Sequence, residues 1–187
     1  MGGMGTFTLG SLRSVPVGGR PDLVSPEVAA ALEALGLGEE VGVVEIDPEL
    51  SDTAATQAAY DLPEDALANC VIVSGRREGE QRIAACLVLA TTRADVNNTV
   101  KRRLDVRKAS FLAREDAVTL TGMEFGAITP IGLPAGWPVF VDRAVLDAPL
   151  IVIGSGLRRT KLLLAGSSLT SIPGVEIIDG LGQPIAP

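Results

Sequence analysis

Histidine is absent from this chain of 187 residues. Its absence excludes catalysis by Ser-His-Asp or Cys-His groups and every metal site that requires an imidazole ligand. The two cysteines, Cys70 and Cys86, are too few to complete a structural zinc site alone. Any chemistry must come from carboxylates, amides, hydroxyls, Lys or Arg side chains, or the backbone. We therefore expect neither a metal nor a cofactor.

Aromatic residues are also scarce, at 3%, whereas hydrophobic residues make up 47% of the chain. The core must therefore be built mainly from Ala, Val, Leu and Ile, and few side chains can stack on the bases of single-stranded nucleic acid. Both cysteines lie in apolar runs, which predicts buried, reduced thiols. No apolar run approaches the roughly 20 residues that span a bilayer. The first ten residues do not resemble a signal peptide, so we expect a cytoplasmic protein without membrane contact.

Charge is distributed unevenly along the chain, whose net charge is −7. Residues 1–65 carry twelve acidic residues and only two arginines, whereas residues 76–108 carry nine basic and four acidic residues. A basic stripe on an acidic protein suits a polyanion bound to one face, although a solvated surface would show the same charges.

Capping and periodicity predict the order of the elements. Residues 1–24 are rich in Gly, Pro and Ser and are expected to form an N-terminal arm, with an edge strand near 6–12; residues 25–187 are expected to form a single domain. Helices are predicted after the caps Ser25 and Asp52, and over 97–104 and 115–121. Strands are predicted over 40–46, 70–74, 82–90, 138–141, 150–153, 161–164 and 175–178, with turns over 75–81 and 91–95.

This order does not alternate strictly between strand and helix, which disfavours a doubly wound parallel sheet. We expect an α/β (α+β) fold with a mixed, mainly antiparallel sheet, curled or closed into a barrel, and helices packed outside it.

The segment from Thr121 to Gly132 contains three glycines and one proline between apolar stretches. Backbone N–H groups in such a loop can hold an anion or a developing oxyanion. Glycine-rich turns without function are also common, and the spacing fits neither a phosphate-binding loop with Gly-Lys-Ser/Thr nor a dinucleotide-binding fingerprint.

The ordered set of motifs resembles the YbaK/prolyl-tRNA-synthetase-associated family of aminoacyl-tRNA deacylases. In that family Thr-Gly ends a helix, a Gly-rich loop with proline follows, an aspartate ends the next strand, and Gly-x-Gly follows a later one. This chain has, in that order, Thr121-Gly122, Gly126-Ala127-Ile128-Thr129-Pro130-Ile131-Gly132, Asp142 and Gly154-Ser155-Gly156. Upstream, Asp52-Thr53-Ala54-Ala55 and Ala68-Asn69-Cys70-Val71 are also similar, so the likeness covers roughly residues 25–170.

The resemblance implies a hydrolase that clears mischarged tRNA by cleaving the aminoacyl ester, without metal or histidine. Its partners would be the tRNA acceptor end and, as an option, an aminoacyl-tRNA synthetase. The implied catalytic residues are Asn69, Gly126, Ile128, Pro130 and Asp142. The implied substrate-binding residues are Thr121, Gly122, Ala127, Thr129, Gly154, Ser155 and Gly156. Contacts to tRNA phosphates are expected from Arg102, Arg103, Lys108, Arg158, Arg159 and Lys161.

Asn69 departs from the family pattern, because many members carry a lysine there. An amide offers a neutral donor and acceptor where lysine offers a positive charge. Either another cation substitutes, with Lys108, Arg158 and Lys161 as candidates, or the activity differs. The leading hypothesis is a trans-acting deacylase. The alternatives are a non-catalytic module that binds tRNA or an aminoacyl ligand, and a hydrolase of another small ester or amide.

Overall fold

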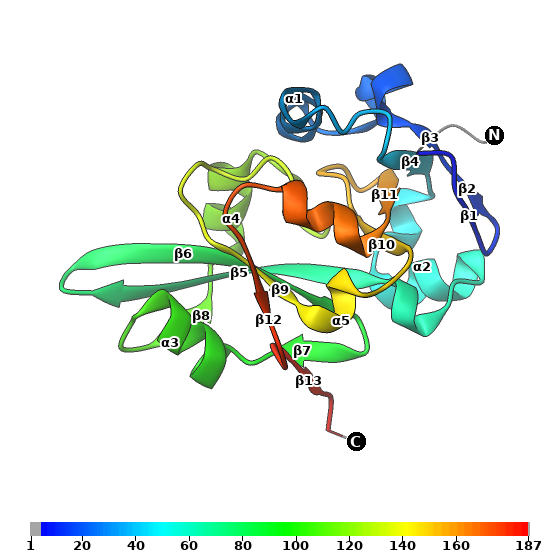
Figure 1. Cartoon of the computed structure of the whole chain (residues 1–187). Helices are drawn as coiled ribbons and strands as arrows, with labels where there is room; N and C mark the ends of the chain where they lie inside the picture. Colours follow the sequence, from blue (N-terminus) through cyan, green and yellow to red (C-terminus); the bar gives the residue numbers. More distant parts are fainter. Residues whose placement is uncertain (1–4, 187) are drawn as a thin grey trace.

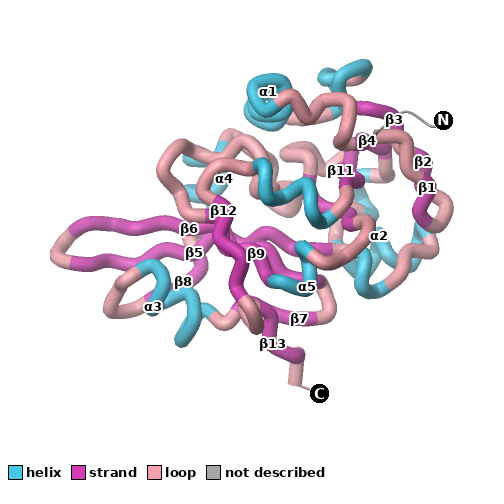
Figure 2. The backbone as a smooth tube through the Cα atoms, viewed as in Figure 1, coloured by secondary structure: helices cyan, strands magenta, loops and turns pink. Residues whose placement is uncertain are grey.

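The computed structural model of this protein describes residues 5–186. Two main sheets with helices around them form the fold (Figures 1 and 2). The larger sheet has the strand order β12-β9-β6-β5-β8. Its β5–β6 and β5–β8 pairs are antiparallel, whereas β9 pairs in parallel with both β6 and β12. The strands are β5 (Ala68–Arg77), β6 (Glu80–Leu89), β8 (Ala109–Phe111), β9 (Val139–Asp142) and β12 (Val175–Ile178).

The smaller sheet has the order β10-β11-β4-β3, and all its pairs are antiparallel. It consists of β3 (Val15–Pro16), β4 (Gly42–Glu45), β10 (Ile151–Gly154) and β11 (Thr160–Leu164). Two further antiparallel pairs join β1 (Thr8–Leu9) to β2 (Leu12–Arg13), and β7 (Thr92–Ala94) to β13 (Gly182–Pro184).

Five α-helices occur in the described residues: α1 (Pro26–Leu35), α2 (Thr53–Tyr60), α3 (Lys101–Leu104), α4 (Arg114–Thr121) and α5 (Arg143–Leu146). The predicted caps explain where two of them begin. The Ser25 hydroxyl accepts a hydrogen bond from the Val28 N–H, and the Asp52 carboxylate accepts one from the Ala55 N–H. Within residues 5–186, no helix has the length and apolarity to cross a membrane.

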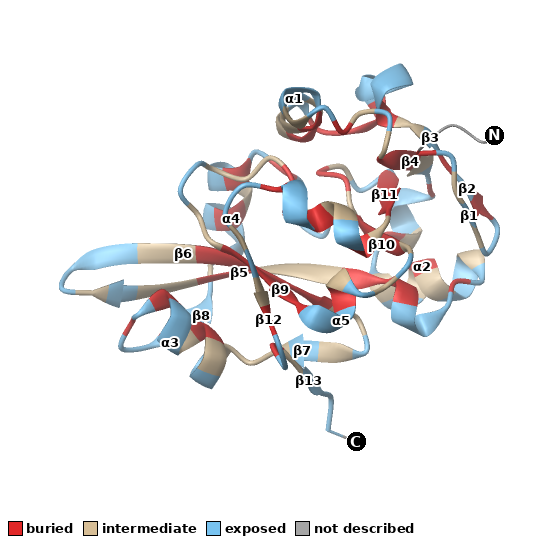
Figure 3. Ribbon diagram, viewed as in Figure 1, coloured by how far each residue is buried: buried red, intermediate tan, exposed pale blue. Residues whose placement is uncertain are grey.

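The two sheets meet where β5 begins. Leu67, just before β5, forms a parallel bridge to Val152 of β10. The largest core cluster joins residues of both sheets, among them Ile72 and Leu87 of one and Ile153 and Leu162 of the other. Figure 3 shows buried positions, in red, near the centre of the larger sheet and along β11 of the smaller one. This junction positions the site described below.

The expected fold class is confirmed, since the sheets are mixed and mainly antiparallel with helices around them. The described residues form no closed barrel, so of the two forms that we expected, the barrel is not the one adopted.

Two predicted turns are replaced by strands. The turn over 75–81 contracts to Glu78 and Gly79, both with positive φ, because this two-residue turn lets β5 and β6 pair along their whole length. The predicted turn over 91–95 contains β7, whose partner β13 lies about ninety residues away in the sequence. Leu12, Val17, Leu23 and Val24, in the predicted arm, are buried. The division of the chain at residue 24 stays a prediction.

Candidate active site

A cavity of about 590 Å³ opens where α2, the start of β5, the glycine loop and the smaller sheet come together. Five of the residues implied by the sequence line it: Asn69, Gly126, Ile128, Gly154 and Lys161. Several other lining residues were not predicted as site residues, and of these Ser51, Thr53, Cys70, Phe111 and Arg114 bear on the chemistry.

Asn69 lies at the start of β5, opposite the first turn of α2. Its Oδ1 accepts a hydrogen bond of 2.6 Å from the hydroxyl of Thr53. This bond leaves both Nδ2 protons available, and no residue in the range 5–186 accepts either of them. The helix cap at Asp52 holds Thr53 in place, so α2 orients the amide as a donor toward the cavity.

The glycine loop is held in shape by backbone hydrogen bonds. The Ala127 N–H bonds to the Glu124 carbonyl at 3.0 Å, and Gly126, with φ +88°, takes the turn position that requires positive φ. The Gly156 N–H in turn bonds to the Ala127 carbonyl at 2.8 Å. Among the described residues, the N–H groups of Gly126 and Ile128 have no acceptor. Two backbone donors at the cavity are therefore free for a ligand.

Gly154 allows this loop to approach the smaller sheet. A Cβ at Gly154 would lie 2.9 Å from the carbonyl oxygen of Ile128 and nearer still to that of Ala127. Any side chain there would push the loop away from β10. The absence of a side chain at Gly154 thus lets the glycine loop lie directly against β10 at the wall of the cavity.

Lys161 reaches the same cavity from β11. Its Nζ donates a 2.9 Å hydrogen bond to the Ser51 carbonyl, and the residue is only 8% exposed. It forms no ion pair within residues 5–186. Burial, reinforced by the charge of Arg158 and opposed by that of Asp52, lowers the pKa of Lys161 to about 8. The ammonium form therefore still predominates at neutral pH.

Cys70 also lines the cavity, but it is not a nucleophile at neutral pH. Burial, with a smaller contribution from Cys86, raises the pKa of the Cys70 thiol far above its usual range. A protonated thiol is a weak nucleophile. Cys86 on β6 is buried, and burial raises its pKa to about 12. Both cysteines are free thiols as predicted, but only Cys86 is buried as expected; Cys70 is half-buried, because it lies at the wall of the cavity.

Several predicted site residues lie outside the cavity. Asp142 is 5% exposed, and its carboxylate accepts hydrogen bonds from the N–H of Ala144 and, at 2.6 Å, from that of Gly182. One oxygen thus caps α5 and the other holds the first residue of β13. The hydroxyl of Ser155 is enclosed by Leu157 and Thr160.

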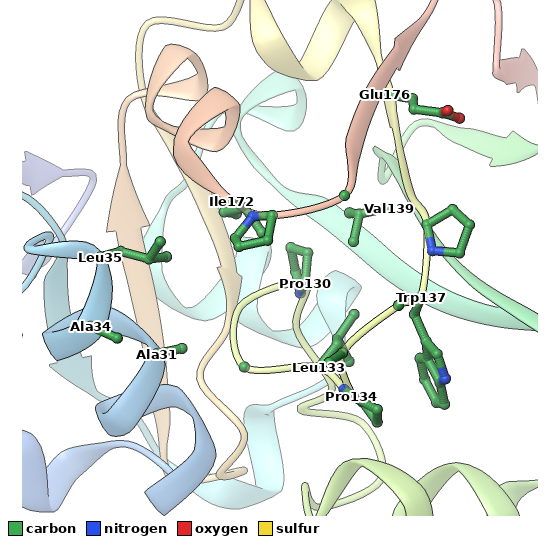
Figure 4. A pocket seen from close by; sticks show the side chains of 16 residues that line it. Ala31, Ala34, Leu35, Pro130, Leu133, Pro134, Trp137, Val139, Ile172 and Glu176 are labelled. Atoms are coloured by element: carbon green, nitrogen blue, oxygen red, sulfur yellow. The ribbon is translucent and has the colours of Figure 1, made fainter.

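The rest of the predicted loop residues have structural surroundings. Thr121 donates to the Ala117 carbonyl and Gly122 terminates α4. Ala127 and Thr129 are buried, and Gly156 packs on Ser25. Pro130 lines a different cavity of about 520 Å³, together with Ala31 and Leu35 of α1 and Trp137 (Figure 4).

The predicted phosphate contacts divide into three groups. Arg158 and Arg159 donate to backbone carbonyls, those of Pro48 and Asp22 respectively, and Lys161 is buried. Arg102 and Arg103, on α3, line neither the cavity nor the groove described next. Lys108 is exposed and lines a shallow groove of about 410 Å³.

This groove, which we call the basic groove, is lined by Ser74, Gly75, Arg76, Gln81, Arg107, Lys108 and Ser110. It shares strand β8 with the cavity, because Ser110 faces the groove and the next residue, Phe111, lines the cavity. Phe111 is 65% exposed, and the guanidinium of Arg114 lies 4.4 Å from the ring centre of Phe125, also at the cavity. Basic side chains therefore line the groove, and both basic and aromatic side chains lie at the adjoining edge of the cavity.

Comparison with known proteins identifies the family. The model of the aminoacyl-tRNA editing domain matches residues 47–172, which is more than half of the chain and includes every polar residue of the cavity named above. The chain belongs to the aminoacyl-tRNA editing domain family. The predicted resemblance is thereby confirmed.

Solved structures share the fold of this editing-domain protein. A candidate trans-editing enzyme for prolyl tRNA synthetase superposes with a TM-score of 0.71 at 22% identity, covering 86% of this chain and 99% of that one. A hypothetical protein gives a TM-score of 0.73 at 18% identity, covering 84% and 99%. A scaffold from epitope-grafting work gives 0.70 at 23%, covering 87% and 100%. At these identities the likeness shows the fold.

The buried ammonium of Lys161 predicts a pH-dependent effect on stability. A pKa of about 8 in the folded state against 10.5 in the unfolded chain costs on the order of 3 kcal/mol below pH 8, where both states are charged. This cost fades as pH rises from 8 to 10.5, since the unfolded state then binds more protons. Lys161→Met should therefore unfold at higher urea concentration than wild type at pH 7, with a smaller difference at pH 10.

An equal difference between Lys161→Met and wild type at both pH values would contradict this explanation. Lys101→Met, on α3, is the control.

Proposed function

We propose that this chain is a trans-acting aminoacyl-tRNA deacylase, a hydrolase that cleaves the ester of mischarged tRNA in the cytoplasm and so contributes to translation quality control. The observation that carries the proposal is the set of free donors in one cavity: Asn69 Nδ2 and the N–H groups of Gly126 and Ile128. Membership of the editing-domain family supports it, as does the likeness to a candidate trans-editing enzyme.

The proposed reaction adds water to the ester carbonyl carbon. The new C–O bond forms as the carbonyl electron pair moves to oxygen, and the intermediate then collapses with cleavage of the bond to the ribose oxygen. That oxygen takes a proton, so the products are the free amino acid and the tRNA 3′ hydroxyl. Fixed donors such as the Gly126 and Ile128 N–H groups suit this charge development. Water is the nucleophile, because the Cys70 thiol stays protonated.

The walls of the cavity suit an uncharged aminoacyl side chain. Ala68, Ile128, Val152 and Ile153 supply apolar surface, and Gly154 leaves space beside it. A hydrophobic wall distinguishes side chains that differ by one methylene only 10- to 200-fold, about 1–3 kcal/mol. We therefore propose a group of small uncharged amino acids as substrates.

The test is a deacylation screen over correctly and incorrectly charged tRNAs. Wild-type protein should hydrolyse a subset of the panel. Asn69→Ala should lower kcat/KM by roughly 10- to 100-fold, because a donor that orients the ester in the cavity is lost. Asn97→Ala, at an exposed asparagine outside the cavity, should leave the rate unchanged.

Two results would contradict the proposal. Failure to hydrolyse any member of the panel, with tRNA binding retained, would favour the non-catalytic binding module. Turnover of small esters that competing tRNA leaves unaffected would favour a hydrolase of another substrate.

Thr53 is proposed as a positioning residue that acts through Asn69. Thr53→Val keeps the shape of the side chain but removes the 2.6 Å hydrogen bond that fixes the amide. We expect kcat to fall about 5- to 10-fold, consistent with loss of a hydrogen bond worth about 1–1.5 kcal/mol, with KM nearly unchanged. Thr53→Ser, which keeps the hydroxyl, should restore the rate. A loss of activity in both variants would instead indicate a packing role.

We also propose that the tRNA acceptor end lies along β8, with phosphates in the basic groove and the 3′ end entering the cavity past Phe111. Arg107 and Lys108 are exposed and form no ion pair within residues 5–186, so their charges are available to phosphates. An exposed phenylalanine beside the cavity can stack on a terminal base.

Charge reversal tests this path. The double variant Arg107→Glu/Lys108→Glu should weaken tRNA binding at least tenfold and make log Kd less dependent on log salt, by about 0.7 per lost phosphate contact. Arg102→Glu/Arg103→Glu carries the same charge change on α3 and should have a much smaller effect. Equal effects of the two double variants would indicate general electrostatic attraction and contradict the β8 path.

A further inference from the structure

Lys161 is the only charged residue of β11, whose other residues are Thr160 and three leucines. All five residues of the strand are buried. Buried ammonium groups are normally paired, because an unpaired charge in an apolar setting is costly. Here the described residues provide only the Ser51 carbonyl, so the ammonium keeps two further protons for another acceptor.

A second unpaired group lies on the same wall of the cavity. Ser51 is 1% exposed, and its hydroxyl is buried without a hydrogen-bond partner in the described chain. Ser51 and Lys161 both line the cavity and are joined through the Ser51 carbonyl. The Ser51 hydroxyl has no acceptor and the Lys161 ammonium has only one, so this wall of the cavity has donors to offer to a ligand oxygen.

We infer that Lys161, assisted by the Ser51 hydroxyl, binds the carbonyl oxygen of the substrate ester and stabilises the negative charge that develops there. This inference rests on the proposed deacylase function and assigns the cation that the reaction uses. As water adds to the carbonyl carbon, the electron pair moves to this oxygen beside the ammonium. When the bond to the ribose oxygen breaks, the pair returns to re-form the carbonyl. Lys161 stays protonated throughout, and the proton that the leaving oxygen gains comes from the attacking water.

Burial separates this role from phosphate binding. Lys161 is 8% exposed, whereas the exposed cations Arg107 and Lys108 lie at the basic groove. A phosphate group retains much of its hydration, which a deep apolar wall would remove at high cost. An uncharged carbonyl oxygen loses far less hydration, and as it becomes negative the ammonium can act on it together with the N–H donors of the glycine loop.

The charged groups around Lys161 are Asp52 at the start of α2, Arg158 beyond β10, and Arg114 of α4, which also lines the cavity. Asp52 favours the ammonium form and Arg158 disfavours it, and burial has the largest effect on the pKa, which falls to about 8. Since kcat/KM reports the ionisation of the free protein, the contribution of Lys161 should disappear as pH rises through about 8.

The experiment compares wild type with Lys161→Gln and Lys161→Met in the deacylation assay. We expect kcat to fall about 100-fold or more in both variants, the usual cost of removing a donor to an oxyanion, with KM for the aminoacyl-tRNA within threefold. Lys161→Met is expected to be more stable than wild type at pH 7, so misfolding would not explain its loss of activity. Lys101→Met is the control for removing a lysine elsewhere.

The pH profile gives a second readout. The ratio of kcat/KM between wild type and Lys161→Gln, measured at each pH, cancels ionisation of the substrate. This ratio should be largest below pH 7 and fall as pH rises through about 8. An NMR titration of the Lys161 side chain in the free protein should give the same midpoint.

The outcomes separate this inference from the proposed function. If wild type deacylates the panel and both variants match it, the role of Lys161 is overturned and the deacylase stands. A rise in KM at unchanged kcat would also overturn it, because the lysine would then contribute only to ground-state binding. If wild type itself is inactive, the deacylase proposal fails and this inference fails with it.

Discussion

The close contact between the glycine loop and the turn after β10 is the constraint on which the site depends. Gly154 has no side chain to separate them, and two hydrogen bonds, Gly156 N–H to Ala127 and Glu124 N–H to Gly156, join the backbones directly. These bonds hold the loop while the N–H groups of Gly126 and Ile128 have no acceptor among the described residues. Gly154 is also the register partner of Lys161 in the β10–β11 pair. One backbone contact therefore positions the donors on both walls of the cavity.

The unpaired donors of the cavity lower the stability of the folded chain, and burial elsewhere in the fold compensates for this cost. Buried donors without acceptors destabilise the folded chain by about 1–3 kcal/mol each. The apolar core extends across both sheets and supplies the compensating burial; Leu162 and Leu164, which follow Lys161 along β11, belong to this core and are themselves fully buried. Such a site is already oriented before substrate arrives. In the proposed reaction, little reorganisation would then be needed when charge develops on the ester, and this is how fixed dipoles and charges accelerate a reaction.

Local signals in the sequence predicted much of the fold. The caps Ser25 and Asp52, and the strand that begins near Asn69, follow from side chains that act on their own backbone neighbours. Strand pairings between segments that are distant in the sequence could not be predicted from such local signals. The β7–β13 pair joins residues 92–94 to 182–184, and only the folded chain brings these segments together. The hairpin turn was predicted too long, because polar residues such as Arg77 can continue a strand on an exposed hairpin.

The same distinction explains which parts of the site the sequence revealed. The loop residues Gly126 and Ile128 stand out because glycine spacing marks a constrained backbone, whereas Lys161 follows Arg158 and Arg159 and so resembles one more surface cation. An alternating pattern of apolar and polar residues would have shown which side chains of the strand point inward. Strand β11 has no such pattern, since it lies between β10 and β4 and is covered on both faces. The amide of Asn69 and the ammonium of Lys161 thus reach one cavity from two different sheets. The chain has no positive charge at the start of β5, and the buried ammonium that lines the same cavity comes from β11, so the junction of the two sheets brings both strands to one site.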